Sequence, residues 1–340
     1  MWLKNWKHGF VKDLEMLLEE SPIPSDKTTP FVTKDGKHIL VTGGAGFIGS
    51  HTVDMLLDCG YSVRVLDDLS SGSLNNLPRK NPRLEFVQGD VRDAGTVMEV
   101  AQGAQACLHL AAQVSVQKSF QDTRASAELN ILGFLNVIEA ARTQGASRIV
   151  YASSAAVYGN PSCLPLRECD LVSPLSPYGI EKLIMEHYAA VLQHPFGISF
   201  LGLRYFNVYG PRQSPSSPYS GVITRFVERL KHWQSPIIYG DGLQTRDFVY
   251  VRDVAWANLA ALESTHTGVC NVSTGTQMPL LTLLEHLREI TTCALKPEFA
   301  PSTPGDIRHS CGDNSRLRED LAVTPEWTLP AGLRALARSD

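Results

Sequence analysis

The sequence predicts an α/β protein built on a doubly wound parallel sheet, with a smaller C-terminal portion. Two observations support this prediction. Short runs rich in apolar and β-branched residues recur along the chain, at residues 38–43, 62–67, 84–90, 106–112, 148–154 and 199–205. Amphipathic stretches lie between several of these runs, and this alternation is typical of parallel strands covered by helices on both faces.

The same pattern divides the chain into three parts. Residues 1–37 are predicted to form an N-terminal helical arm and linker, because Leu3–Glu20 has apolar residues at helical spacing and three prolines follow it. Residues 38–207 contain the six predicted strands. In residues 208–340 proline and glycine are denser and the pieces shorter, so we expect a smaller portion from which some segments return to the main sheet.

Composition argues against several classes of protein. The 340 residues have a net charge of −4 with no cluster of either sign, so no nucleic-acid partner is expected. No apolar run reaches the roughly 18 residues of a spanning helix, so no membrane partner is expected. Seven scattered cysteines without a C-x-x-C pair indicate reduced thiols in a cytoplasmic protein. No metal site is predicted.

Three glycines follow the first strand and open the next helix. Gly43 permits a tight turn, Gly46 lets a pyrophosphate approach the backbone, and Gly49 lets the helix pack on the strand. Asp67 ends the second strand, where its carboxylate is placed to accept hydrogen bonds from adenosine ribose hydroxyls. A carboxylate there repels a 2′-phosphate, so NAD is favoured over NADP. Asp90 ends the third strand, where it either meets the adenine amino group or is a turn residue.

A second constellation lies in the segment SPYGIEK. Tyr178 and Lys182 are four residues apart on a predicted helix, so they share one face. An ammonium beside a phenol favours the phenolate, so we expect a lowered pKa for Tyr178, which makes it a usable base near neutral pH. Ser153 and Ser154 end an upstream strand that we expect to lie over the cofactor. Together these residues predict an acid/base site.

Six segments carry a resemblance to a known family: VTGGAGFIGSH, SSAAVYG, SPYGIEK, LRYFNVYGPRQ, TRDFVYVRDV and PGDIRHS. From about His38 to the C-terminus, the chain resembles the extended short-chain dehydrogenases/reductases, and most of all the UDP-hexose 4-epimerases. The resemblance implies a Rossmann-type domain at 38–207 that binds NAD, and a portion at 208–340 that mainly binds a UDP-sugar. The N-terminal arm lies outside most of the likeness, although some epimerases of N-acetylated sugars have a similar arm.

The resemblance assigns roles to individual residues. Ser154 corresponds to the residue that bridges the sugar hydroxyl and the tyrosine, Tyr178 to the base, and Lys182 to the residue that holds the nicotinamide ribose. Further cofactor-binding residues implied by the resemblance are Phe47, Ile48, Val91, Leu110, Ala111, Ala112, Asn130 and Tyr205, with Phe206 beside the nicotinamide. Implied substrate-binding residues are Asn207 and Arg246 for the diphosphate, Val222, Ile223 and Tyr239 for the uracil, Asp306 and Arg308 for the ribose and phosphates, and Ser310 for the sugar. Two alternatives stay open: Tyr239 as a core residue, and Asp306 with Arg308 as a surface pair.

Two positions bear on the sugar and the subgroup. Val114 stands where many galactose-type epimerases have a lysine near the cofactor. Ser310 stands where glucose-restricted epimerases have a tyrosine, which fills the space that an N-acetyl group needs. The resemblance therefore implies UDP-N-acetylglucosamine and UDP-N-acetylgalactosamine as substrates, alongside UDP-glucose and UDP-galactose. An ordinary loop serine at this position is the alternative.

The implied reaction is C4 epimerisation through a transient 4-keto sugar. Tyr178, directly or through Ser154, takes the proton of the 4-hydroxyl, and the C4 hydride passes to NAD⁺. The ketose then turns about its diphosphate and is reduced on its opposite face. The cofactor is regenerated in each turnover, so it can stay tightly bound.

Other functions remain as alternatives. Ala155 and Ala156 stand where a dehydratase needs an acid and a base, which argues against that reaction. A nucleotide-sugar reductase needs no further group and stays open, and a non-catalytic NAD-binding scaffold is a more remote alternative. The resemblance also suggests a homodimer packed through the helices containing Asn130–Ala141 and Tyr178–Leu192.

Overall fold

The structure is a computed structural model that describes residues 36–214, 221–302 and 307–338. The predicted helix at Leu3–Glu20 and the candidate residue Asp306 lie outside the described residues. Within them, no helix combines the length and the apolar character that crossing a bilayer requires.

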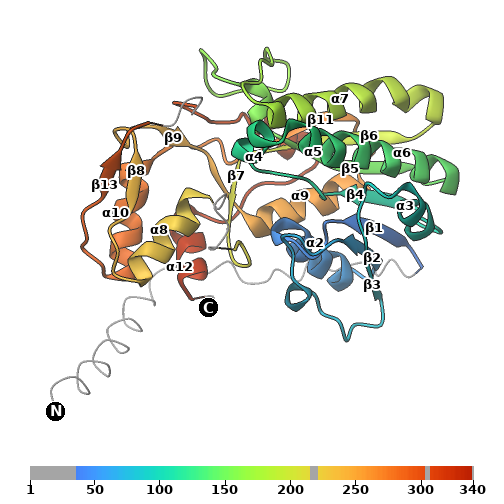
Figure 1. The fold of residues 1–340 in the computed structure, drawn as a ribbon, viewed down its shortest axis with the longest axis horizontal. Helices are drawn as coiled ribbons and strands as arrows, with labels where there is room; N and C mark the ends of the chain where they lie inside the picture. The colour runs from blue at the N-terminus through green and yellow to red at the C-terminus, as the bar shows by residue number, and fades with distance from the viewer. Residues whose placement is uncertain (1–35, 215–220, 303–306, 339–340) are drawn as a thin grey trace.

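A seven-stranded parallel sheet forms the centre of the protein (Figure 1), in the order β11-β6-β5-β4-β1-β2-β3. Its strands are β1 (His38–Thr42), β2 (Ser62–Asp67), β3 (Leu84–Gln88), β4 (Ala106–His109), β5 (Arg148–Ser154), β6 (Ser199–Tyr205) and β11 (Gly268–Val272). The predicted α/β class and doubly wound parallel sheet are confirmed. The seventh strand, β11, comes from the C-terminal portion and pairs with β6.

Helices cover both faces of the sheet, as Figure 1 shows. On one face, α2 (Phe47–Asp58) and α9 (Val251–Glu263) pack on each other and share a core with Ile39 and Val41 of β1. On the other face, α3 (Ala94–Val100), α6 (Gly133–Gln144) and α7 (Pro177–Phe196) share a second core, which contains Leu40. Alternate residues of β1 therefore face opposite layers, which explains why the strand is apolar along its length.

Between β4 and β5 the chain forms a series of short helices before α6. They are α4 (Val116–Gln121), α5 (Thr123–Ala127) and a π-helical turn, η2 (Glu128–Leu132). All three pack against α7. π-Helical turns occur often at functional sites, and this one holds Asn130, a predicted cofactor-binding residue. Within the described residues, 3₁₀ turns also occur at η1 (Leu74–Asn76) and η3 (Ala155–Tyr158).

The C-terminal portion has its own core and lies beside the main sheet, at the left of Figure 1. Its main helices are α8 (Val222–Lys231), α10 (Leu280–Thr291) and α12 (Leu329–Arg338), while α11 (Ser315–Glu319) packs beside β11. Three two-stranded pairs complete it: β7 (Asn207–Tyr209) with β10 (Phe248–Tyr250), β9 (Thr245–Arg246) with β12 (Met278–Pro279), and β8 (Ile237–Tyr239) with β13 (Glu298–Ala300).

The strand order places the site. β1 lies between β2 and β4, and the chain builds the sheet outward from β1 in both directions. In doubly wound sheets the loops at the carboxyl ends of such strands diverge and leave a crevice where ligands bind. The glycine segment follows β1 and residues 110–112 follow β4, so both border this crevice.

Candidate active site

The glycine turn after β1 is closely packed. Gly43 has a φ of +71°, and a Cβ at this position would lie 2.6 Å from the backbone nitrogen of Ala111. A Cβ at Gly49 would lie 2.1 Å from the carbonyl oxygen of Gly43. The tight turn predicted at Gly43 and the close helix packing predicted at Gly49 are therefore confirmed.

The first turn of α2 is built to receive an anion. Gly46 is the N-cap residue and supplies no side-chain cap, and the first turn contains no acidic residue. The N–H groups that open a helix have no intrahelical acceptor, and the helix dipole favours negative charge at this end. Phe47 and Ile48, two predicted cofactor-binding residues, lie in this turn. The arrangement fits the pyrophosphate of a dinucleotide.

Asp67 lies at the end of β2 with both carboxylate oxygens already oriented. Its Oδ2 accepts the Ala45 N–H and its Oδ1 accepts the Leu69 N–H, each at 2.9 Å. Burial raises the pKa of Asp67, and these backbone hydrogen bonds oppose the rise. A carboxylate oxygen has two acceptor sites, so each oxygen keeps one for a further donor such as a ribose hydroxyl.

The residues after β3 and β4 are held mainly by local contacts. Asp90 accepts the Arg92 backbone N–H at 2.8 Å and forms an ion pair with the Arg92 guanidinium, which lowers the pKa of Asp90. These contacts give it a turn role and an ionic partner that the sequence analysis missed, while its contact with the adenine stays a prediction. Val91 is buried against Gly133. The Leu110 N–H donates to the backbone oxygen of Thr42, and the Ala111 N–H donates to the Thr42 Oγ1. These two hydrogen bonds hold the half-buried segment beside the glycine turn.

Ser154 and Tyr178 meet where η3 packs against the start of α7. Ser154 ends β5, and its Oγ caps η3 by accepting the Ala156 N–H at 3.1 Å. Ser176 caps α7, and Pro177 at the first helical position places Tyr178 in the first turn. The two turns touch because position 179 is glycine: a Cβ there would lie 2.8 Å from the Ala156 carbonyl oxygen. The Ser154 hydroxyl lies close enough to the Tyr178 hydroxyl to oppose the rise that burial causes in the pKa of Tyr178.

Lys182 lies one turn further along α7, on the face that carries Tyr178. Its side chain is buried, and its Nζ lies 5.9 Å from the centroid of the Tyr178 ring. The predicted shared face is therefore confirmed. Burial lowers the pKa of Lys182 to about 8, and Glu181 opposes this. The ammonium keeps its proton at neutral pH.

The predicted lowering of the Tyr178 pKa is wrong for this arrangement. Burial raises the pKa of Tyr178, the nearby Ser154 hydroxyl opposes the rise, and the charge of Glu181 adds to it. The Lys182 ammonium lies over the ring rather than at the hydroxyl. Loss of hydration of the phenolate outweighs the attraction that the sequence suggested.

A buried ion pair attaches α7 to the sheet. The Arg204 guanidinium of β6 donates to both carboxylate oxygens of Glu186, at 2.9 and 2.7 Å. Glu186 also accepts the hydroxyl of Ser153, next to Ser154. Arg204 also donates to the Tyr158 hydroxyl at 2.9 Å, so η3 belongs to the same network.

Asn130 and Tyr205 are engaged inside the protein. The Asn130 amide bonds to the backbone of Gln113 and to Glu181. The Tyr205 side chain lies in the core shared with α2 and α9, where its hydroxyl donates to Asn258. It therefore lies on the opposite face of the sheet from α7, and its side chain is not brought to Tyr178. Phe206 packs in a small separate core.

Predicted substrate residues are joined by Asp247, which the sequence analysis missed. Asp247 follows Arg246 and is fully buried, and its backbone oxygen accepts the Asn207 N–H at 3.0 Å. Its carboxylate accepts N–H groups of Thr274, Gly275 and Gly312, at 2.8, 2.9 and 3.2 Å. Because it directly follows the arginine in TRDF, its place in the motif was the available signal.

Ser310 lies in a segment that runs beside β9. Its N–H donates to the Thr245 carbonyl at 3.2 Å, and its side chain is 7% exposed. Arg308 forms an exposed ion pair with Asp241 through two hydrogen bonds, both at 2.7 Å. The structure thus brings Ser310 and Arg246 onto one small framework.

The uracil candidates lie in the same C-terminal portion. Val222 opens α8 and is half-buried, while Ile223 is buried in its core. Tyr239 is 43% exposed, so the alternative that it is a core residue is wrong. Val114, at the departure from the lysine pattern, is exposed.

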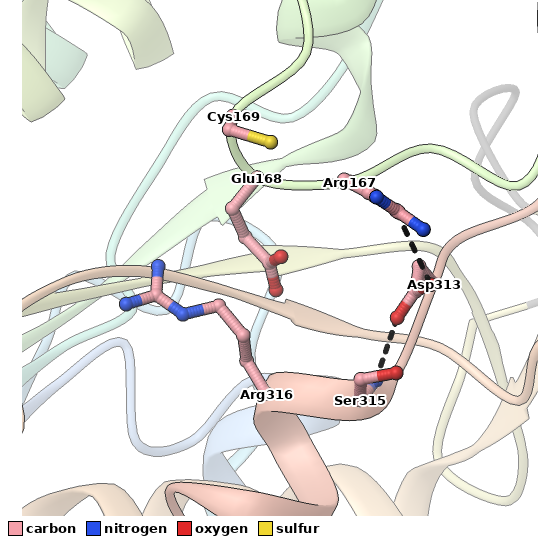
Figure 2. Close-up of a pocket in the computed structure, with 6 residues that line it drawn as sticks. All are labelled: Arg167, Glu168, Cys169, Asp313, Ser315 and Arg316. Atoms are coloured by element: carbon pink, nitrogen blue, oxygen red, sulfur yellow. Dashed lines mark hydrogen bonds and ion pairs between the residues drawn. The ribbon is translucent and has the colours of Figure 1, made fainter.

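A surface pocket of about 420 Å³ lies away from these residues, at the outer edge of β11 (Figure 2). Glu168 accepts the Asn271 N–H at 2.8 Å and Arg316 donates to the Val269 carbonyl at 2.9 Å, so both cover the edge strand. Arg167 pairs with Asp313. None of the predicted site residues lines this pocket. Across the described ranges, no cluster of three or more His, Cys, Asp or Glu has a metal-binding arrangement.

Comparison with known proteins places this geometry in a family. The model of the NAD dependent epimerase/dehydratase family matches residues 39–273. A putative UDP-glucose 4-epimerase of Methanocaldococcus jannaschii is 44% identical over 298 residues, which cover 87% of this chain and 96% of that protein.

Two solved structures are similar over nearly their whole length. The UDP-N-acetylglucosamine 4-epimerase from Methanobrevibacter ruminantium M1, in complex with UDP-N-acetylmuramic acid, has 36% identity and a TM-score of 0.86, covering 89% of this chain and 98% of that one. The UDP-glucose 4-epimerase from Thermotoga maritima with UDP-glucose has 38% identity and a TM-score of 0.85, covering 88% and 97%. The glycine turn, the Tyr178–Lys182 helix and these matches together show that the chain belongs to the NAD dependent epimerase/dehydratase family.

Proposed function

We propose that this protein is a UDP-sugar 4-epimerase, an isomerase with tightly bound NAD. The observation that carries the proposal is the approach of the Ser154 hydroxyl to Tyr178, with Lys182 over the same ring. Ala155 and Ala156 follow Ser154 in η3 and have no proton to exchange. This set suits reversible oxidation at one sugar carbon better than dehydration.

NAD would be held by the residues that border the crevice. The first turn of α2 suits its pyrophosphate, Asp67 its adenosine ribose, and Lys182 its nicotinamide ribose. When bound, NAD accepts the hydride from C4 and returns it. The protein's task is then to hold the sugar and to manage one proton.

Proton transfer falls to Tyr178 and Ser154. Tyr178 takes the proton of the sugar 4-hydroxyl directly or through the Ser154 hydroxyl, and gives it back when the hydride returns. Burial alone keeps the phenol protonated. Positive charge at the site lowers the pKa of a phenol, and Lys182, with a pKa of about 8, is protonated at neutral pH.

The sugar specificity follows from the side chain at position 310. Ser310 is small and lies on the framework that carries Arg246, the residue proposed to hold the diphosphate. We infer that this leaves room for an N-acetyl group, so that UDP-N-acetylglucosamine and UDP-N-acetylgalactosamine are substrates alongside UDP-glucose and UDP-galactose. Both kinds of enzyme, named for N-acetylglucosamine or for glucose, occur among the similar structures.

The proposed enzyme is a cytoplasmic homodimer. Leu132 in η2 and Ile180 and Val191 on α7 are exposed apolar side chains, Val191 at 70%, on the helices through which we expect two copies to pack. An apolar stripe on neighbouring helices favours association with a second copy.

The first prediction tests the reaction and its base. Purified protein should interconvert UDP-sugars without added cofactor. Tyr178→Phe should lower kcat by at least about a hundredfold, because it removes the proposed proton acceptor and keeps the ring. NMR analysis of products from a panel of UDP-sugars measures both.

The matched control is Tyr188→Phe, which removes an exposed hydroxyl from the same helix. Dependence on added NADH would identify a reductase, and no turnover at all would favour the non-catalytic scaffold. Near-normal turnover in Tyr178→Phe would remove this residue from the mechanism.

The second prediction concerns cofactor choice. Asp67→Asn should weaken NAD binding and relax discrimination against NADP, because the amide loses the charge that repels a 2′-phosphate. Titration calorimetry with both dinucleotides measures this, and the exposed neighbour Asp68 gives the control Asp68→Asn. Wild-type protein that binds NADP as tightly as NAD would contradict our assignment of Asp67.

The third prediction concerns the sugar. Ser310→Tyr should abolish activity on the two N-acetylated sugars and spare the plain hexoses, because steric exclusion rejects a larger substrate strongly. The measurement is kcat/KM for all four UDP-sugars. Ser147→Tyr, at the exposed amino end of β5, controls for the added ring. Equal losses on both classes, or a wild type inactive on the acetylated pair, would disprove the assignment.

The fourth prediction concerns assembly. The wild type should be a dimer by sedimentation equilibrium, and Val191→Glu should convert it largely to monomer by placing a charge in the proposed interface. Leu243→Glu, at an exposed apolar residue of the C-terminal portion, should leave the dimer intact. A monomeric wild type would overturn the proposal.

A further inference from the structure

We propose that Glu181 is a positioning residue of the active site: it clamps α7 to the π-helical turn η2 and keeps a buried negative charge beside the reactive pair. The inference goes beyond the base, the cofactor and the sugar assigned above. Its catalytic meaning rests on the proposed function. The effect of Glu181 on the packing of α7 against η2, and the effect of its charge on Tyr178, can be measured without substrate.

The carboxylate of Glu181 is held from one side only. The residue is 3% exposed, and its Oε2 accepts hydrogen bonds from the Ser126 hydroxyl at 2.8 Å and from the Asn130 amide. Ser126 lies on α5 and Asn130 in η2, and both are buried. The other oxygen, Oε1, is buried without a hydrogen-bond partner.

Asn130 extends the clamp to the crevice. Its amide donates to the Gln113 carbonyl at 3.0 Å and its Oδ1 accepts the Gln113 N–H at 2.8 Å. The Gln113 side chain returns to the Ser126 hydroxyl at 3.3 Å. Gln113 directly follows Leu110–Ala112, the segment that borders the glycine turn. Glu181 therefore fixes this segment against the catalytic helix.

Burying this carboxylate costs free energy of folding, so we expect its charge to have a function. Only neutral donors bind it, and among the described residues no Lys or Arg forms an ion pair with it. Burying a charge without an opposite charge is unfavourable, and an isolated buried oxygen adds to the cost. Glu181 lies between Tyr178 and Lys182 in the sequence of α7, and its charge raises the pKa of both groups.

Other ionisable groups near this part of α7 are exposed or neutral. Lys118 on α4 is exposed, and Arg124 of α5 pairs with Glu128 of η2 at the surface, at 2.9 Å. His109 of β4 is buried, and burial, followed by the charge of Lys182, lowers its pKa to about 3, so it carries no charge at neutral pH. Glu186, further along α7, is neutralised by Arg204. Glu181 thus supplies a charge that is not neutralised in an ion pair and that acts on both Tyr178 and Lys182.

The test replaces the charge and keeps the shape. In Glu181→Gln the amide oxygen can still accept from Ser126 and Asn130. With tyrosine labelled with carbon-13 at the ring Cζ, NMR titration of the protein as purified, without UDP-sugar, follows Tyr178, whose signal is identified by its loss in Tyr178→Phe. We expect the Tyr178 titration to move to lower pH by at least about half a unit. In the profile of kcat against pH, both the acidic and the basic limb should also move to lower pH, because the pKa values of Tyr178 and Lys182 both fall.

Two further variants separate charge from clamp. Glu181→Asp keeps the charge but shortens the side chain, so both limbs should stay in place while the protein retains NAD less tightly through purification. Glu99→Gln makes the same chemical change on the exposed face of α3 and should alter neither readout.

A folded Glu181→Gln with an unchanged Tyr178 titration and unchanged limbs would overturn the proposal, even if its melting temperature fell. If Glu181→Gln does not fold, Glu181→Asp provides the test. In that variant, a shift of either limb of the kcat profile against pH, or NAD retention equal to that of the wild type, would overturn the proposal. Failure of the proposed function has a different signature. The wild type would then convert no UDP-sugar, while the NMR titration would still report the effect of Glu181 on Tyr178.

Discussion

The buried ion pair between Glu186 and Arg204 is the interaction on which the geometry of the site depends. It joins α7 to β6 through two short hydrogen bonds, and the Ser153 hydroxyl brings the end of β5 into the same contact. Ser154 and Tyr178 lie on the two elements joined in this way. Removing one partner of a buried pair leaves an uncompensated charge and costs about 3–5 kcal/mol. The relative position of the two hydroxyls is therefore fixed by a strong contact that touches neither of them.

Two carboxylates on α7 meet opposite environments. Glu186 forms an ion pair with the Arg204 guanidinium, and this ion pair holds the helix in place. Glu181, five residues earlier, accepts hydrogen bonds from a hydroxyl and an amide, which are both neutral. Its charge therefore acts on Tyr178 and Lys182. The same residue type thus anchors the helix at one position and influences the acid/base pair at the other. The difference lies in which donors the neighbouring elements present.

Sequence patterns predicted the elements and missed the contacts that cross between them. Strands buried on both faces leave continuous apolar runs, and the helical period alone puts Tyr178 and Lys182 on one face. The pKa of Tyr178 depends on how far the fold buries the phenol, which spacing does not report. Glu181 and Asp247 find donors 55 and 65 residues away, so no local pattern could indicate their roles. The side on which Tyr205 projects likewise follows from strand register.

Asp247 anchors the sugar segment through main-chain groups. It accepts the N–H of Gly312. A Cβ at position 312 would lie 2.5 Å from the Ser273 Oγ and 2.7 Å from the Phe206 ring, so the backbone is closely packed there. The side chain at position 310 plays no part in this anchoring, since only its N–H is used. A mutation that changes the side chain at position 310 therefore removes none of these main-chain hydrogen bonds. Natural selection can thus act on this side chain while descendants of the protein inherit the same backbone contacts around it.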